Sequence, residues 1–260
     1  MGPPHNAPNC PTAATPPPPA DDMKHPPLAL TRTAAWCLLL SLGLSACTTV
    51  KTQAYNAWNN IRSLVVFQDT SRESYGVDIV AHPGANFGMV GTLVAQLDMS
   101  SKSLRLTQAL NPQTTALQER LAVRLAHALS AEGYDSTVVP VSGDHARREA
   151  VPAVLPVPAD AYITLDVQAR YIAAGPMSDY LPYVRVNVAQ NDTRTGKVLY
   201  EDTLAYGYDQ GNAHVVHLPS DSRYRFKDID SLLSNPDKAR EGLQAGVDAI
   251  VAQIASDLQR

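Results

Sequence analysis

The chain has 260 residues, a formal net charge of −4 and 45% hydrophobic residues. This weakly acidic balance, with no basic stripe interleaved with aromatic residues, excludes the usual signature of a nucleic-acid partner. The part that follows residue 46 is long enough to bury the core of one domain of ordinary size. Composition therefore predicts a globular domain, and two small domains remain the alternative.

Residues 1–22 are rich in proline, with a run of four at 16–19. Such a composition cannot bury an apolar core, so we expect an unstructured leader. Met23, followed by Lys24, is a better start for a signal peptide than Met1. The true start stays open between these two methionines.

A short apolar run at 34–46 lies downstream of Lys24 and Arg32 and ends in small residues. A basic, an apolar and a small-residue region in this order are typical of a secretory signal. The run is too short to span a bilayer, which needs about 20 apolar residues. We expect residues 23–46 to be a cleaved signal peptide. The alternatives are an uncleaved anchor helix and an ordinary signal with a chance cysteine.

The signal ends in Leu44-Ser45-Ala46-Cys47, which resembles the lipobox of bacterial lipoproteins. The resemblance implies that the Cys47 sulfur carries a diacylglyceryl group and that the new amino terminus is acylated after cleavage. Several acyl chains hold a protein at a membrane durably, whereas one chain holds it reversibly. Thr48, which is not aspartate, implies sorting to the outer membrane by the same resemblance. The covalent lipid on Cys47 is the only cofactor that we expect.

Cysteine usage limits the chemistry of the mature chain. Cys10 and Cys37 precede the expected cleavage site, so only Cys47 survives, with its sulfur in a thioether. The mature domain would then contain neither a disulfide nor a free thiol. A nucleophilic cysteine, a zinc ribbon and a redox pair are excluded together.

The first half of the domain alternates strand and helix patterns. Residues 47–63 form either a polar tether or a short helix that carries Tyr55, Trp58 and Ile61 on one side, and this spacing favours the helix. Short apolar runs predict strands at 64–67 and 77–80. We treat residues 64–260 as one domain.

The segment 84–110 is the most distinctive part of the domain. Glycine costs a helix about 1 kcal/mol relative to alanine, so Gly88 and Gly91 indicate a loop or a close helix contact. The pattern allows a helix with an apolar side, interrupted by the polar residues 98–102; its apolar positions are Val90, Leu93, Val94, Leu97, Leu104 and Leu106. We expect a core helix approached closely by a neighbour, and a membrane-touching or partner-binding helix is the alternative.

A second helix is predicted at 115–131. Thr115 and Gln118 have the spacing of a capping box, leucines recur every four residues from Leu117, and Gly133 supplies a stop. A strand should follow at 134–141. This helix and strand weakly resemble modules of small α+β periplasmic lipoproteins that assist envelope transport and assembly.

The second half predicts a meander and a final helix. After a proline-rich connector at 142–160, alternating patterns indicate strands at 162–171, 183–190 and 198–208, with a turn at 191–197. The segment 210–227 is irregular, and 228–234 is a short helical turn. Asn235 and Pro236 then begin a helix to the carboxyl end. Its apolar residues should cover the meander; they are Ala239, Leu243, Val247, Ile250, Ile254 and Leu258.

Candidate sites are few. His214 and His217 could serve a metal if they lay on a helix, but Val215 and Val216 between them indicate an extended segment that separates them. The residues Ser142, Asp144 and His145 are too close in sequence to build a catalytic triad by themselves. Gly196-Lys197 lacks the upstream glycine of a phosphate-binding loop and belongs to the turn.

Tyrosines are the other candidates for binding. A groove for a sugar or a peptide could be lined by Tyr180, Tyr183, Tyr200, Tyr206 and Tyr208, although tyrosines on a meander usually pack within the sheet. We retain Tyr206, Tyr208, His214 and His217 as binding candidates, and we assign no catalytic residue and no metal ligand.

These patterns lead to one interpretation. We expect an α+β fold in which an antiparallel sheet carries helices on one face, behind a lipid anchor at Cys47. The function expected is that of a non-enzymatic accessory or interaction component of the cell envelope, with a membrane and an envelope protein as partners. The alternatives are a periplasmic hydrolase and a small-ligand or metal-binding lipoprotein, either of which would use the 210–227 loop.

Overall fold

The computed structural model describes residues 60–142 and 157–259, which belong to the unit Thr49–Arg260. Several sequence predictions lie outside the described residues: the leader, the signal peptide, the lipobox with Cys47 and Thr48, the tether up to residue 59, and most of the 142–160 connector with Asp144 and His145.

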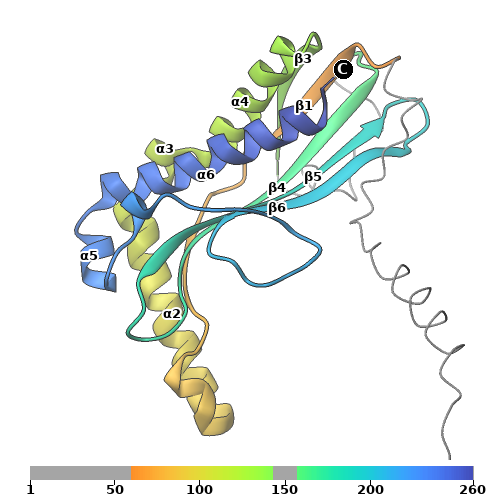
Figure 1. Cartoon of the computed structure of the whole chain (residues 1–260). Helices are drawn as coiled ribbons and strands as arrows, with labels where there is room; N and C mark the ends of the chain where they lie inside the picture. The colour runs from red at the N-terminus through yellow and green to blue at the C-terminus, as the bar shows by residue number, and fades with distance from the viewer. Residues whose placement is uncertain (1–59, 143–156, 260) are drawn as a thin grey trace, which may run out of the picture. The chain divides into compact units, whose positions relative to one another are not determined.

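The described residues form a seven-stranded mixed sheet with helices packed on one face (Figure 1). The strands are β1 (Ser63–Asp69), β2 (Tyr75–Ile79), β3 (Asp135–Val141), β4 (Ala161–Ala173), β5 (Tyr180–Asp192), β6 (Val198–Gly207) and β7 (Val216–Leu218). The helices are η1 (Pro83–Phe87), α2 (Gly88–Leu110), α3 (Pro112–Thr115), α4 (Leu117–Ala131), η3 (Ser222–Tyr224), α5 (Ile229–Leu233) and α6 (Pro236–Asp257). The α+β fold class predicted from the sequence is confirmed.

The expected meander consists of β4, β5 and β6, which pair antiparallel in sequence order. Val167 pairs with Val186, and Val186 pairs with Leu204, so that apolar side chains of all three strands align on the face toward the helices. The alternation of apolar and polar residues predicted which side chains face the helices, because successive side chains of a strand point to opposite faces. The pairing register itself comes from the structure.

The remaining strands make the sheet mixed. β1 pairs in parallel with the beginning of β4, and β2 pairs in parallel with its end, so the two strands follow one another along the same edge. β3 then pairs in parallel with β1 at the outer edge. Two parallel strands need a long crossover connection. Between β1 and β3 the chain forms β2, η1, α2, α3 and α4.

Helix α4 begins differently from the prediction. Thr115 and Gln118 do not form a capping box, because the Thr115 hydroxyl donates to the Leu110 carbonyl at 2.6 Å. The N-cap residue is Ala116, whose methyl side chain cannot cap the helix. A distant carboxylate replaces it, because Glu73 accepts from the backbone amides of Leu117 at 3.0 Å and Gln118 at 2.7 Å.

The end of α4 follows the prediction. Gly133 has a φ of 89°, a left-handed conformation that glycine adopts without strain. The Gly133 amide bonds to the Ser130 carbonyl, and the Tyr134 amide bonds to the Leu129 carbonyl. This pair of bonds closes the helix as a Schellman motif.

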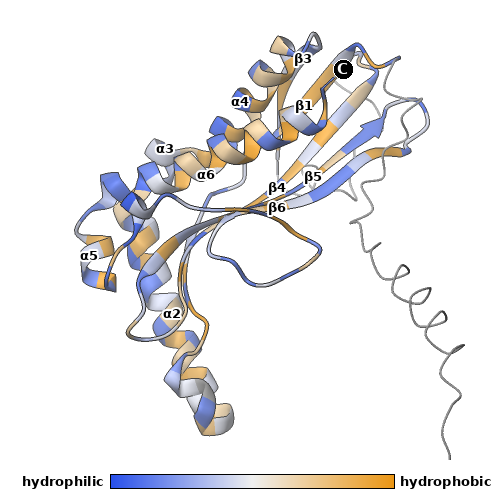
Figure 2. Ribbon diagram, viewed as in Figure 1, coloured by the Kyte–Doolittle hydropathy of each residue, from blue (hydrophilic) through white to orange (hydrophobic). Residues whose placement is uncertain are grey.

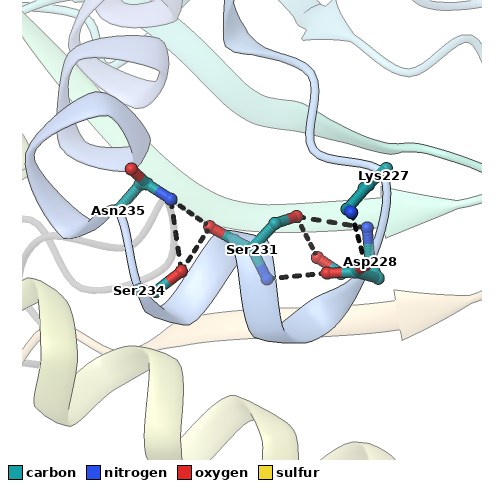
Figure 3. Close-up of polar contacts among 5 residues, drawn as sticks. All are labelled: Lys227, Asp228, Ser231, Ser234 and Asn235. Carbon is teal, nitrogen blue, oxygen red and sulfur yellow. Dashed lines mark hydrogen bonds and ion pairs between the residues drawn. The ribbon is translucent and has the colours of Figure 1, made fainter.

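Helix α5 has a reciprocal cap that Figure 3 shows in detail. The Asp228 carboxylate accepts from the Ser231 amide at 2.7 Å, and the Ser231 hydroxyl faces the Asp228 amide at 3.3 Å. Asn235 stands at the N-cap position of α6 with Pro236 next to it, as predicted, but its side chain does not cap α6. Its amide instead donates to the Ser231 carbonyl at 2.8 Å and so closes α5.

Helix α6 covers the meander. The predicted apolar side is fully buried, since Ala239, Leu243, Val247, Ile250, Ile254 and Leu258 each have an exposed fraction of 0%. These residues join the strand residues and the leucines of α4 in one apolar cluster. Among the residues that the structure describes, the opposite face of the sheet carries two small apolar clusters, one with Phe67 and one with Tyr183.

Candidate interaction surface

Helix α2 is continuous over 23 residues, so the predicted interruption at 98–102 is wrong. Polar residues of this helix bond to the edge strand β2. The Ser103 hydroxyl accepts from the Val77 amide at 2.8 Å, and the Thr107 hydroxyl accepts from the Tyr75 amide at 2.9 Å. The hydroxyls of Ser103 and Thr107 therefore satisfy backbone donors of a strand edge, which would be costly to bury unpaired.

A polar cluster fixes the chain that leads into α2. Asp98 pairs with Lys102 at 2.5 Å and with the Nε2 atom of His82 at 3.3 Å, while the Nδ1 atom of His82 accepts from the Gly84 amide at 3.1 Å. Partial burial acts to raise the pKa of Asp98, but the hydrogen bonds from Lys102 and His82 outweigh it and hold that pKa below its ordinary value. The cluster ties η1 to the middle of α2.

Glycines allow η1 to fold back against α2. A Cβ atom on Gly91 would lie 2.1 Å from the Gly84 carbonyl oxygen, and one on Gly84 would lie 2.7 Å from the Gly91 carbonyl oxygen. Only residues without a Cβ permit this approach. The close contact that the sequence predicted at Gly91 is confirmed, and its partner is the neighbouring turn.

The outward side of α2 is apolar and exposed. Seven residues in this part of the chain are between 56% and 90% exposed: Phe87, Met89, Val90, Leu93, Val94, Leu97 and Leu104. With about 3.6 residues per turn, they fall opposite the buried residues of α2, which are Gly91, Ala95, Leu106 and Leu110. We call these seven residues the α2 stripe. Figure 2 shows apolar residues along the length of this helix.

The α2 stripe corrects the expectation of a core helix. Leu106 is buried as expected, but Val90, Leu93 and Leu97 are exposed. Side chains of this size, exposed to this degree, present on the order of 100 Å² each. Together they exceed the roughly 300–600 Å² of the largest apolar patch on a typical monomer. A helix that is apolar on both sides is usually covered on both sides.

The first half of α2 and the turn that precedes it also carry no charged residue. From Pro83 to Leu97 the sequence contains no aspartate, glutamate, lysine or arginine. Such a surface offers no ionic partner for a charged ligand, and it suits contact with another apolar surface. Within residues 60–142 and 157–259, no helix is long and apolar enough to cross a membrane.

The two histidine candidates do not converge. His217 lies on β7, where its Nε2 atom is 2.9 Å from the Gly207 carbonyl oxygen, and it shares a cavity of about 20 Å³ with Asp209 and Tyr208. His214 is exposed and does not line that cavity. In the described part of the chain, no group of three or more histidine, cysteine or acidic residues could hold a metal ion. Ligand binding at His214 or His217 stays a prediction.

The five tyrosines do not line one groove. Tyr180, Tyr200 and Tyr206 belong to the core beneath the helices, whereas Tyr183 and Tyr208 belong to a small cluster on the opposite face. Tyr206 is 4% exposed, and its hydroxyl accepts from the Asp221 amide at 3.2 Å. Of the binding candidates, Tyr206 therefore contributes to the core, and Tyr208 remains accessible at a rim.

The structure also reveals an open cleft that the sequence did not indicate. It has a volume of about 860 Å³ and lies between the β1–β2 connection and the start of α4, with Arg72, Glu73 and Glu119 in its lining. Asn111 and Ala116 also line it, and they are the non-glycine residues with positive φ in the described ranges, at 50° and 41°. Asparagine is among the non-glycine residues that most often adopt positive φ, whereas alanine gives no such signal.

Comparison with known proteins gives no family. No family model matches the chain, and no curated protein matches it. Among solved structures, the PelC dodecamer from Paraburkholderia phytofirmans is 13% identical over 76% of this chain and 90% of that chain, with a TM-score of 0.33. Lipoprotein GNA1162 from Neisseria meningitidis is 18% identical over 75% of this chain and 99% of that chain, with a TM-score of 0.26.

A third solved structure, protein XCC0632 from Xanthomonas campestris, carries the family description DUF330. It is 13% identical over 54% of this chain and 63% of that chain, with a TM-score of 0.29. Similarities this low assign neither a family nor a function to the chain, and the functional argument depends on its own residues.

Proposed function

We propose that this chain is a lipoprotein of the cell envelope, anchored through Cys47, and that its folded domain is a non-enzymatic interaction component. The α2 stripe is the observation that carries the proposal. An exposed apolar surface of this size on a folded domain marks a site of contact with another macromolecule. The domain would dock through α2 onto a protein while the acyl chains hold it at the outer membrane.

The anchor is supported by the sequence Leu44-Ser45-Ala46-Cys47, and the outer-membrane location is supported by Thr48. Two lipid attachments are needed for durable membrane binding, and a processed lipobox cysteine supplies them. The domain needs no apolar span of its own under this arrangement. Anchor and stripe then have separate tasks, the first fixing the location and the second selecting the partner.

The anchor is tested by replacing Cys47 with serine in cells fed radiolabelled palmitate. We expect the wild-type chain to incorporate the label and to sediment with membranes, and the Cys47→Ser chain to do neither. Incorporation of label by the Cys47→Ser chain, together with its sedimentation, would contradict lipidation at this residue.

The stripe is tested by site-specific photo-crosslinking in intact cells. A photoreactive amino acid at Leu93 should capture a protein in the envelope. The matched control is Val123 on α4, an isolated apolar side chain that is 49% exposed, and the same probe there should capture none. Equal yields of protein adducts at the two positions, or none at Leu93, would show that the stripe is not an interaction surface.

A further inference from the structure

We infer that the α2 stripe binds the α2 stripe of a second copy of this chain. The inference rests on the proposed function, since it names the partner of the same surface. Two observations on the described residues favour a second copy: the lack of charge over most of the stripe, and its area.

Lack of charge makes the surface complementary to itself. A two-fold axis places the same patch of both copies face to face. A charged residue near the centre would therefore face the same charged residue of the other copy and be repelled by it. Six of the seven stripe residues avoid this repulsion, because the first charged residue of α2 is Asp98. Leu104 alone lies beyond it, at the end of the stripe and next to Arg105. Asp98 is paired with Lys102 and His82 within its own copy.

The area fits a dimer. Seven exposed apolar side chains at roughly 100 Å² each approach the ~800 Å² per partner of a standard protein interface. The composition fits as well, because interfaces between identical copies are more apolar than transient ones. Leucine, valine, methionine and phenylalanine at helical spacing also let two helices interlock their side chains.

Single cysteines test the contact in the full-length chain. Leu93→Cys, Val94→Cys and Leu97→Cys add one thiol each to a mature chain whose Cys47 sulfur is expected in a thioether. Cells producing epitope-tagged and untagged copies together are oxidised mildly and analysed without reducing agent. We expect disulfide dimers of two tagged copies and of one tagged with one untagged copy. They should be at least tenfold more abundant than for the exposed control Val123→Cys.

Charged substitutions in the stripe test the same contact by the loss of dimers. Leu93→Asp combined with Leu97→Asp should abolish photo-crosslinked dimers formed from a probe at Val90, whereas Val123→Asp should leave them unchanged. Both substitutions lie at exposed positions, and circular dichroism of the purified variants verifies that they fold.

The outcomes separate this inference from the proposed function. Failure of all three cysteine variants to dimerise, while a probe at Leu93 still captures a different protein, overturns self-association and leaves the interaction role standing. Capture of lipid alone at Leu93, or Leu93-dependent flotation of the Cys47→Ser chain with phospholipid vesicles, overturns both.

Discussion

At the scale of single residues, Glu73 joins the β1–β2 connection to the helical layer. One carboxylate oxygen accepts from the Leu117 amide and from the Tyr75 hydroxyl, and the other accepts from the Gln118 amide. Burial and the bond to Glu73 raise the pKa of Tyr75 well above its ordinary value. The first turn of α4 is therefore capped from a part of the chain more than forty residues earlier.

Glu73→Ala should lower the free energy of unfolding by roughly 1–3 kcal/mol, because it removes a helix cap and leaves the hydroxyl of the buried Tyr75 without its acceptor. Urea denaturation of the Cys47→Ser chain measures the change. Glu119→Ala, an exposed position on the first turn of the same helix, should change stability by no more than about 0.5 kcal/mol. Equal effects of the two substitutions would refute the cap.

At the scale of elements, α2 is attached to the domain through polar bonds as much as through apolar packing. Ser103 and Thr107 complete the edge of β2, and Asp98 ties η1 to the helix through His82 and Lys102. Such bonds fix which side of the helix faces inward. They leave the apolar residues of its first half on the outside.

The Asp98 cluster makes this attachment dependent on pH. Because the pKa of Asp98 is lower in the folded state, its stabilising contribution is present above the unfolded value of about 3.9 and is lost as the pH falls through the folded value. Asp98→Asn should therefore be less stable than wild type at pH 7, and the difference should shrink below about pH 4. Exchange of backbone amides in η1 and α2 would report the change locally.

The control for this pH dependence is Asp179→Asn, at an exposed position in the β4–β5 turn. Its stability difference from wild type should stay small between pH 3 and pH 7 by comparison with Asp98→Asn. A difference for Asp98→Asn that does not vary over this range would show that the Asp98 carboxylate does not hold η1.

At the scale of the whole domain, α6 unites the meander with α4. It approaches the sheet closely at two glycines: a Cβ atom on Gly242 would lie 2.6 Å from the Tyr171 hydroxyl oxygen, and one on Gly246 would lie 2.7 Å from the Tyr206 ring. The Tyr171 hydroxyl also donates to the Ala239 carbonyl at 2.9 Å. The distance between helix and sheet is thus set by residues that lack a side chain.

Gly246→Ala should destabilise the domain by roughly 1–3 kcal/mol through overpacking against Tyr206 and Val184. Helix propensity alone predicts the opposite, a gain of about 1 kcal/mol for alanine over glycine. Ala252→Gly, at an exposed position of the same helix, isolates that propensity and should cost about 1 kcal/mol. Thermal and urea unfolding of both variants would decide, and a more stable Gly246→Ala variant would contradict the close approach.

The amino-acid sequence by itself determined the local features of the fold. Alternation predicted β4 and β5 and their inward-facing side chains, and the turn before β6 predicted the hairpin. Helical spacing predicted the buried side of α6, because such a pattern reports one face of one element. The stop of α4 at Gly133 was equally local. A lipobox is local as well, so the expected anchor at Cys47 needed no fold.

Only the tertiary structure revealed the contacts between segments that lie far apart in the sequence. The cap of α4 comes from Glu73 rather than Thr115, and β1 and β2 run parallel to β4, because both arrangements depend on segments brought together by folding. The sequence likewise showed apolar residues at helical spacing in 90–104 but could not tell their direction. That direction follows from Ser103 and Thr107 meeting the edge of β2, which turns the opposite, apolar side of α2 toward solvent.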